Sequence, residues 1–437
     1  MRVLCLYQHY ATPDAPANAR LYAMLDALAG RHEVDVVTSR QLMDRRPPPG
    51  ERRFPDAPPG VRLHYVDAPY DNAMGTRARL ASYGRFAWGA LRVARRLPRP
   101  DVVYGISTPL STAAAAATAA RHHRCPWVFE VRDLWPDFPV QMGAVPRLLR
   151  RPLYRIEHAL YRSAARVISV SPDMAAHVDA VAPGKGALHW QGTDPDLFAL
   201  TTDADAQALR ERLGLGDRRV ALYSGSLGRA NAVDALVGAA ERLRHRDDLA
   251  VVVLGGGYGA DAVRAAAARL PNLVYAGQEP RWRALAYLRL ADLALVPFLD
   301  KPVLAANAPG KLFDALWAGV PAVVTNPGWT RRLVEEYGCG WYAPPTAGDL
   351  ADAITRALGD TDGLAAAGRR AAAFARPAFD RRRLAGALEA TWAAAAGITL
   401  PDAPAPFPTP GDGAAGPPPP PPNPAYRRAS GSDGGGA

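Results

Sequence analysis

Two kinds of segment alternate along the first 190 residues. Short apolar runs at 2–7, 33–39, 101–106, 126–133 and 165–171 predict strands. Longer segments between them, such as 19–32, carry apolar residues at helical spacing and predict helices. Apolar strands separated by helices indicate parallel strands joined by crossover helices.

The same rhythm resumes after a turn-rich passage at 181–200. Further strands are predicted at 219–226, 249–257, 273–278, 293–299 and 321–326, with helices at 232–245 and 310–319. The sequence therefore predicts an α/β protein with two consecutive doubly wound, Rossmann-like domains that face each other across a cleft. We expect the first domain at 1–190, the second at 191–385 and a terminal helix at 386–399. The Pro- and Gly-rich tail at 400–437 is expected to be disordered.

Composition limits the setting in which the chain works. Its 437 residues carry a formal charge of +10 and three cysteines without metal-type spacing, which fits a reducing cytoplasm. The apolar start is too short for a signal peptide, and no apolar run approaches the length of a membrane span. We therefore expect a cytoplasmic protein. The positive charge leaves nucleic acid, anionic lipid and phosphorylated small molecules open as partners.

The clearest chemical signal is the segment 306–321. Pro309, Gly310 and Lys311 come directly before a predicted helix, and Asp314 lies one turn inside it. Unpaired N–H groups and a lysine at a helix start favour a phosphate, while a carboxylate accepts hydrogen bonds from sugar hydroxyls. Phosphate and polyol together indicate a nucleotide. An ordinary capped helix explains the same spacing.

Two glycine turns follow predicted strands. The first holds Gly225, Gly228 and Arg229, so that the backbone can approach a ligand closely beside a fixed cation. An ordinary strand-to-helix turn would explain the same residues. The second begins at Gly255. Its glycine spacing does not match the dinucleotide fingerprint, and no acidic residue closes the next strand. A nicotinamide site is therefore disfavoured.

The first domain offers charged residues at a strand end. Arg132 and Asp133 follow Glu130 on a buried strand, and Trp135 comes next. Buried charges are costly unless they serve a site or pair with one another, and both explanations stay open, as does a core position for Trp135.

Further basic residues stand near the first helix and on two later segments. Asn18 and Arg20 stand at the start of the first helix, where Arg20 either points into the cleft or lies on the surface. The arginine-rich, aromatic-containing stretches 77–99 and 147–166 suit an anionic membrane surface, and a solvated arginine face explains them equally well.

Taken together these segments resemble one enzyme family. Residues 132–136 read RDLWP and residues 311–321 read KLFDALWAGVP. The chain resembles bacterial family 4 (group 1) glycosyltransferases of polysaccharide and glycolipid assembly, which have the two-domain GT-B fold. The segments ARVISVSPDMAAHV, HWQGTDPDLF and GSLGRANAVDAL are similar to further family motifs, and the resemblance runs from about residue 1 to about residue 395.

The resemblance implies a retaining transfer from a nucleoside-diphosphate sugar to a lipid-linked or polysaccharide acceptor. Lys311 and Arg229 would stabilise the charge that grows on the leaving diphosphate, and Asp314 would hold the ribose. No metal or cofactor is expected. The implied donor-binding residues are Gly225, Gly228, Gly255, Asn307, Pro309, Gly310, Leu312 and Asp314. The implied acceptor-side residues are Asn18, Arg20 and Trp135, with Arg132 and Asp133 as catalytic candidates.

The sequence departs from the family at one important position. Ala306 stands where many members have a glutamate that contacts the donor sugar. A nucleotide-sugar-binding protein without transfer activity and a sugar-nucleotide epimerase therefore remain alternatives. A nucleic-acid binder is disfavoured, because no known nucleic-acid motif occurs and the chain has two large domains that such binding does not need.

Overall fold

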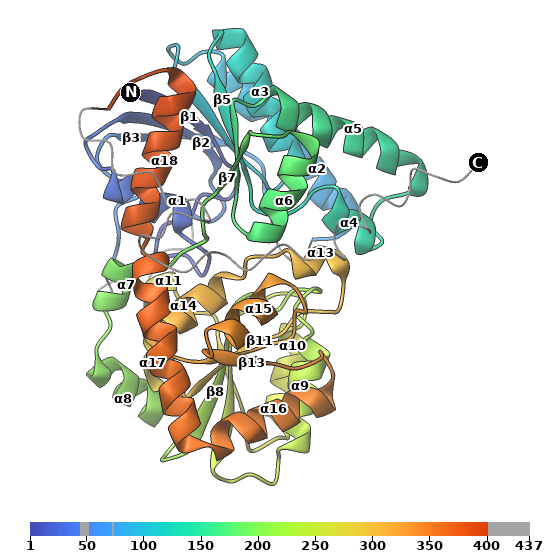
Figure 1. Cartoon of the computed structure of the whole chain (residues 1–437), viewed down its shortest axis with the longest axis vertical. Coiled ribbons are helices and arrows are strands. Elements are labelled where there is room, and N and C mark those ends of the chain that lie inside the picture. The colour runs from blue at the N-terminus through green and yellow to red at the C-terminus, as the bar shows by residue number, and fades with distance from the viewer. Residues whose placement is uncertain (44–51, 72–73, 401–437) are drawn as a thin grey trace.

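A computed structural model describes residues 1–43, 52–71 and 74–400. Two α/β domains lie one above the other, with the first domain at the top of Figure 1. The tail expected to be disordered falls, from residue 401 on, outside the described residues.

The first domain contains a parallel sheet of seven strands within the described residues, ordered β3-β2-β1-β4-β5-β6-β7. The central strands are buried on both faces, which explains their continuous apolar sequence. The strands are β1 (Arg2–Leu6), β2 (Glu33–Ser39), β3 (Val61–Val66), β4 (Val102–Ile106), β5 (Trp127–Val131), β6 (Arg166–Ser169) and β7 (Gly186–Leu188).

Six helices connect these strands in the described part of the domain. They are α1 (Arg20–Ala27), α2 (Thr76–Ala94), α3 (Leu110–His123), α4 (Asp137–Gln141), α5 (Arg147–Ser163) and α6 (Pro172–Val181). The alanine-rich segment forms α3, whose small side chains lie against β4. Helices α2 and α5 both pack on α3 and turn their other faces outward.

The second domain repeats the design with six parallel strands, ordered β10-β9-β8-β11-β12-β13 in the described chain. They are β8 (Arg219–Ser224), β9 (Leu249–Leu254), β10 (Leu273–Gly277), β11 (Leu293–Val296), β12 (Ala322–Val324) and β13 (Gly340–Tyr342). The helices are α7 (Pro195–Ala199), α8 (Asp203–Arg212), α9 (Val233–Arg242), α10 (Ala260–Ala267), α11 (Arg281–Ala284), α12 (Ala286–Leu290), α13 (Pro302–Ala305), α14 (Gly310–Ala318), α15 (Trp329–Glu336), α16 (Ala347–Gly359) and α17 (Thr361–Ala378).

Three strands did not follow from the apolar pattern. β3 is only partly buried, and β7 and β13 are three-residue strands at sheet edges. β7 lies inside the passage 181–200, which the sequence suggested to be turns. Short edge strands have few apolar positions, so the sheet neighbour rather than local sequence determines them.

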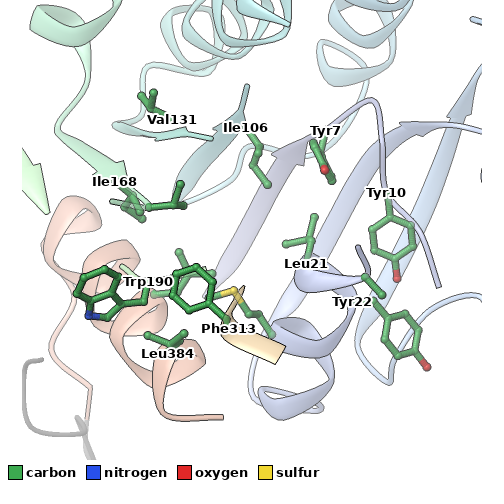
Figure 2. Packing of buried hydrophobic residues seen from close by; sticks show 14 of the residues in the cluster. Tyr7, Tyr10, Leu21, Tyr22, Ile106, Val131, Ile168, Trp190, Phe313 and Leu384 are labelled. Atoms are coloured by element: carbon green, nitrogen blue, oxygen red, sulfur yellow. The ribbon is translucent and has the colours of Figure 1, made fainter. Parts of the chain in front are cut away.

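The chain returns to the first domain at its end. After α17, helix α18 (Arg381–Ala396) packs on α1, β4 and β5, and therefore begins earlier than the helix expected at 386–399. Where the chain crosses between the domains, Thr193 of the outgoing segment and Asp380 of the returning segment pair in an isolated parallel β-bridge. Figure 2 shows Trp190, Phe313 and Leu384 close together. The buried cores of the two domains are continuous there.

Candidate active site

The carboxyl edges of the two sheets face each other. Ser171, which follows β6, donates its hydroxyl to the carbonyl of Ala306, which follows β11. The backbone N–H of Arg281, which follows β10, donates to the carbonyl of Ala15 in the loop after β1, at 3.0 Å. Loops at the carboxyl ends of parallel strands are where such folds bind ligands. The junction between the domains is therefore the candidate site.

Helix α14 begins at this junction without a side-chain cap. Its N-cap residue is Pro309, and its first turn contains no acidic residue. An ordinary side-chain cap therefore does not explain this segment, because no side chain in the described part of the chain caps this helix through a hydrogen bond. An uncapped helix N-terminus presents unpaired N–H groups and a partial positive charge.

Lys311 adds a full charge at the same place. Its Nζ lies 3.2 Å from Oδ1 of Asn231 and 4.0 Å from the ring centroid of Tyr223. Burial lowers the pKa of Lys311 to about 7. Within the described residues Lys311 forms no ion pair. A cation over an aromatic ring without a carboxylate partner is suited to an anionic ligand.

The two glycine turns fit closely against each other and against Lys311. Gly225 has a φ of +154°, and a Cβ there would lie 3.0 Å from Cε of Lys311, so a larger residue would be strained and would displace the lysine side chain. Gly255 has a φ of +142°, and a Cβ there would lie 1.8 Å from the carbonyl oxygen of Gly225. Gly228 lies next to the Asn231 side chain. The glycines thus shape the loop that meets the start of α14.

Arg229 lies elsewhere in this loop. Its Cζ is 3.7 Å from the ring centroid of Tyr258, and both side chains are exposed. Asn231 rather than Arg229 contacts Lys311. Arg229 remains a candidate for the leaving diphosphate, whereas Asn231, Tyr223 and Phe298 are the side chains recorded around the Lys311 ammonium.

Asp314 is held by other groups of the junction. Arg281 donates from Nη1 to Oδ2 at 2.7 Å and from Nη2 to Oδ1 at 2.6 Å, and the Thr193 hydroxyl also donates to Oδ1. The carboxylate is buried. Any ribose hydroxyl that binds Asp314 must share it with Arg281 or replace one of these contacts.

The side chains of the remaining donor-side positions are buried, and they differ in which polar groups have hydrogen-bond partners. The Leu312 side chain is buried in the core and its N–H donates to the Pro309 carbonyl at 2.9 Å. The Asn307 carbonyl accepts from Nε1 of Trp329 at 2.9 Å, while its side-chain Oδ1 is buried without a partner. Ala306 is fully buried. Its methyl side chain has no oxygen atom, so it cannot make the sugar contact of the missing glutamate.

Arg20 has a role that neither expectation described. It is 1% exposed and donates to both carboxylate oxygens of Glu130 at 2.7 and 2.8 Å. It also donates to the carbonyls of Trp190 and Gln191 at the domain crossing. The surface position is therefore wrong, and the buried guanidinium does not line an open acceptor surface. Arg20 instead joins β5 to the crossing segment.

Of the two alternatives left open for Glu130, Arg132 and Asp133, the described residues show no ion pair among the three, because Glu130 pairs with Arg20. Arg132 donates from Nη1 to the Tyr7 hydroxyl at 2.6 Å, and the Thr108 hydroxyl donates to Asp133 at 2.7 Å. Burial raises the pKa of Asp133. Both residues keep part of their surface accessible, as does Trp135 beside them.

Asn18 lies against the second domain. Its Oδ1 accepts from the backbone N–H of Arg20 at 3.0 Å and from Nη2 of Arg381 at 3.1 Å. Its Nδ2 lies 3.0 Å from the position that a Cβ at Gly310 would take. Asn18 therefore stands at the start of α14, rather than on the acceptor side alone.

Four residues of this site were missed from the sequence: Thr193, Tyr223, Asn231 and Arg281. Asn231 and Tyr223 lie within the glycine-turn segment, so their place beside the motif was a usable signal. Arg281 carried none, because it follows an unremarkable strand and meets Asp314 only through the fold.

Across residues 1–43, 52–71 and 74–400, no group of three or more side chains of metal-binding type comes together. No helix in the same residues is long and apolar enough to cross a membrane.

Comparison with known proteins defines the class. Residues 17–189 match the family model described as "Glycosyl transferase 4-like domain", and residues 218–360 match "Glycosyl transferases group 1". The chain therefore belongs to the family 4, group 1 glycosyltransferases. The fold agrees. Sucrose-phosphate synthase of Thermosynechococcus elongatus aligns over 90% of this chain and 98% of its own with a TM-score of 0.68 and 18% identity. The structure of Anabaena HepE in complex with UDP-glucose aligns over 90% of this chain and 100% of its own, with a TM-score of 0.66 and 18% sequence identity. These structures are of the GT-B type.

Curated relatives match over part of their length. A GDP-mannose-dependent alpha-(1-6)-phosphatidylinositol monomannoside mannosyltransferase of Mycolicibacterium smegmatis is 33% identical over 42% of this chain and 48% of its own. The putative colanic acid biosynthesis glycosyl transferase WcaI of Escherichia coli is 26% identical over 59% of this chain and 65% of its own length. The matched region thus spans about half to two thirds of these relatives.

Proposed function

We propose that the protein transfers a sugar, with retention of configuration, from a nucleoside-diphosphate sugar to a lipid-linked or polysaccharide acceptor. The observation that carries this proposal is the start of α14. There an uncapped helix N-terminus and Lys311, which has no carboxylate partner in the described chain, meet at the carboxyl edge of the second sheet. Family membership supplies the reaction type.

The diphosphate fits this place for electrostatic reasons. When the sugar–phosphate bond breaks, negative charge grows on the leaving diphosphate. Fixed N–H donors and the Lys311 ammonium stabilise that charge most when it is fully developed, which lowers the barrier. Arg229 is assigned to the same charge, after a movement from its stack on Tyr258. With these cations the scheme calls for no metal or cofactor.

The acceptor is assigned to the opposite edge. Asp133 is accessible, and a carboxylate whose pKa burial raises can take a proton from an acceptor hydroxyl. Arg132, held by Tyr7, lies beside it and can orient the reacting groups. The mycobacterial relative above is named for GDP-mannose and for phosphatidylinositol monomannoside, and the HepE structure contains UDP-glucose. These names support the substrate class and leave both nucleotides as candidates.

A peripheral membrane position is proposed on the outer faces of α2 and α5. Among the described residues, five of the seven exposed large apolar side chains lie on these helices: Leu80, Trp88, Leu148, Leu149 and Ile156. Arginines interleave with them, and this combination binds anionic lipid surfaces. Sedimentation with vesicles containing phosphatidylglycerol should fall at least tenfold in Leu148→Asp/Leu149→Asp. The control Arg264→Asp, on exposed α10, should change it little.

A donor screen tests the main proposal. Purified protein is incubated with UDP-, GDP- and dTDP-sugars, and release of nucleoside diphosphate is followed by mass spectrometry. Release from one donor, lost in Lys311→Ala, is expected. If a nucleotide stabilises the fold but no donor is cleaved in the presence of a broad acceptor panel, the protein is a binding protein. Conversion of the donor sugar without transfer would indicate an epimerase instead.

A further inference from the structure

A buried arginine stands where the chain returns from the second domain to the first. Arg381 is the first residue of α18, is 1% exposed and forms no ion pair within the described residues. Its guanidinium donates to neutral oxygen atoms instead, and its Nη1 is buried without a partner. A charge that leaves water without a carboxylate partner is costly. Such a side chain is better explained by a specific contact than by packing.

Two of its contacts lie at the domain crossing. Nη2 of Arg381 donates to the Gly192 carbonyl at 3.1 Å, and Nε donates to the Gln191 carbonyl at 3.5 Å. Gly192 has a φ of +63°, and a Cβ there would lie 2.9 Å from the carbonyl oxygen of Phe379. A larger residue would therefore be strained and would push the outgoing and returning segments apart. These contacts fix the guanidinium between the two segments.

The third contact reaches the loop before α1. Nη2 of Arg381 donates to Oδ1 of Asn18 at 3.1 Å, and the backbone N–H of Arg20 donates to the same atom at 3.0 Å. An amide oxygen only accepts hydrogen bonds and an amide nitrogen only donates them. Two donors on one atom therefore assign it as the oxygen. The orientation of the Asn18 amide is fixed by these two donors.

The other end of this amide lies at the start of α14. Nδ2 of Asn18 would be 3.0 Å from a Cβ at Gly310, the first residue of that helix. Within the described residues Nδ2 donates to no group, and Asn18 keeps part of its surface accessible. Its N–H groups are thus available where the helix start and Lys311 are proposed to receive the diphosphate.

The charge of Arg381 has no direct counterpart among the nearby acids. Burial, and then the charge of Arg281, lower the pKa of Arg381 to about 9, so the guanidinium is charged near pH 7. Of the carboxylates that act on it, Asp314 is paired with Arg281 and Asp194 caps α7. Neither forms an ion pair with Arg381 in the described chain. Pairing with an acid therefore does not explain the residue.

We propose that Arg381 is a positioning residue: it holds the Asn18 amide in the orientation in which Nδ2 donates to the phosphate groups at the start of α14. This role rests on the proposed function, and it makes the anion site a composite of both domains. Without Arg381 the amide would keep only one of the two donors that fix it. Its oxygen, which repels a phosphate, could then turn toward the helix start.

Two substitutions of Asn18 separate a phosphate ligand from a structural amide. Asn18→Asp keeps an oxygen for Arg20 and gives the buried guanidinium of Arg381 a carboxylate, so the melting temperature should stay the same or rise. The second carboxylate oxygen replaces the N–H donors. The affinity for UDP, GDP or dTDP, measured by calorimetry, should therefore fall at least about tenfold, and further than in Asn18→Ala. Gln207→Glu, the same change from amide to acid at an exposed position of α8, is the matched control.

A double-mutant cycle tests whether Arg381 acts through Asn18. Arg381→Gln should weaken nucleoside-diphosphate binding about fivefold, but less than about twofold when Asn18 is already alanine, because the amide that it positions is then gone. A purely structural role would give the same loss in both backgrounds. Arg381→Lys, which keeps the charge but not the fork of donors, gives the same comparison if Arg381→Gln does not fold. Arg383→Gln, exposed in the same turn of α18, is the control.

The outcomes distinguish this inference from the proposed function. Wild-type affinity in Asn18→Asp, or equal losses from Arg381→Gln with and without Asn18, would overturn the inference, while nucleotide binding by the wild type would leave the proposed function in place. If the wild type binds none of the three nucleoside diphosphates, the proposed function fails and the inference fails with it.

Discussion

Lys311 makes donor binding depend on pH in a way that can be calculated. Its pKa is about 7 because burial disfavours the charged form, so near neutral pH only about half of the molecules carry the charge. A diphosphate at the start of α14 binds the protonated form and raises its pKa. Donor affinity should therefore be highest below pH 7 and fall as pH rises through 7, until the pKa of the complex is reached.

The magnitude follows from the fraction protonated. Between pH 6 and pH 8 that fraction falls about tenfold, so the dissociation constant of the nucleotide sugar should rise about tenfold, equivalent to about 1.4 kcal/mol. The buried histidines His9 and His189 do not titrate in this range, because burial lowers the pKa of both to about 4.

Calorimetry in buffers of different ionisation enthalpy measures both the affinity and the protons taken up. Uptake of a proton near pH 8 is expected in the wild type and should vanish in Lys311→Arg, which stays charged throughout. Arg229→Gln, a charge change in the neighbouring loop, should keep the pH slope. A slope that is absent from the wild type, or that survives in Lys311→Arg, would refute the reasoning.

Three further predictions concern stability and metal. Asp314→Asn removes a buried carboxylate that pairs with half-buried Arg281, and it should lower the free energy of unfolding in urea by about 3 kcal/mol. The exposed control Asp261→Asn should change that free energy little, and equal effects of the two substitutions would contradict the pairing. Gly255→Ala places a side chain at a φ of +142° and a Cβ 1.8 Å from the Gly225 carbonyl oxygen, so it should lower the free energy of unfolding by at least about 3 kcal/mol. The control Gly359→Ala meets no neighbouring atom and should leave the free energy of unfolding unchanged or raise it. Sugar transfer should persist in EDTA at a rate within about twofold of the untreated enzyme, since Lys311 and α14 supply the stabilising charge; loss that Mg²⁺ restores would disprove the metal-independent scheme.

Much of the fold could be predicted from the sequence because its strands are buried on both faces. Long apolar runs such as 249–254 and 102–106 can lie only inside a covered parallel sheet, so their number and spacing already indicated two doubly wound domains. The start of α14 could also be predicted from the sequence, because Pro309, Gly310 and Lys311 are adjacent in the chain and their chemistry is local.

What the sequence could not provide are contacts between residues far apart in the chain. Arg20 and Glu130 are 110 positions apart, and Asp314 meets Thr193 and Arg281 from three different segments. The sequence shows an arginine or an aspartate at each place but not which charge it faces. Burial then decides the role, because a charge that leaves water must find a partner, and the partner is chosen by the packing.

The sequence by itself thus determined the class of fold, the order of the two domains and the position of the helix start that we propose as the phosphate site, since each depends on short-range periodicity and on groups close in the chain. Only the tertiary structure decided that Arg20 ties β5 to the domain crossing and that Asn231 rather than Arg229 meets Lys311. Those roles depend on distance and burial, which exist only once the two sheets have folded and their carboxyl edges have met.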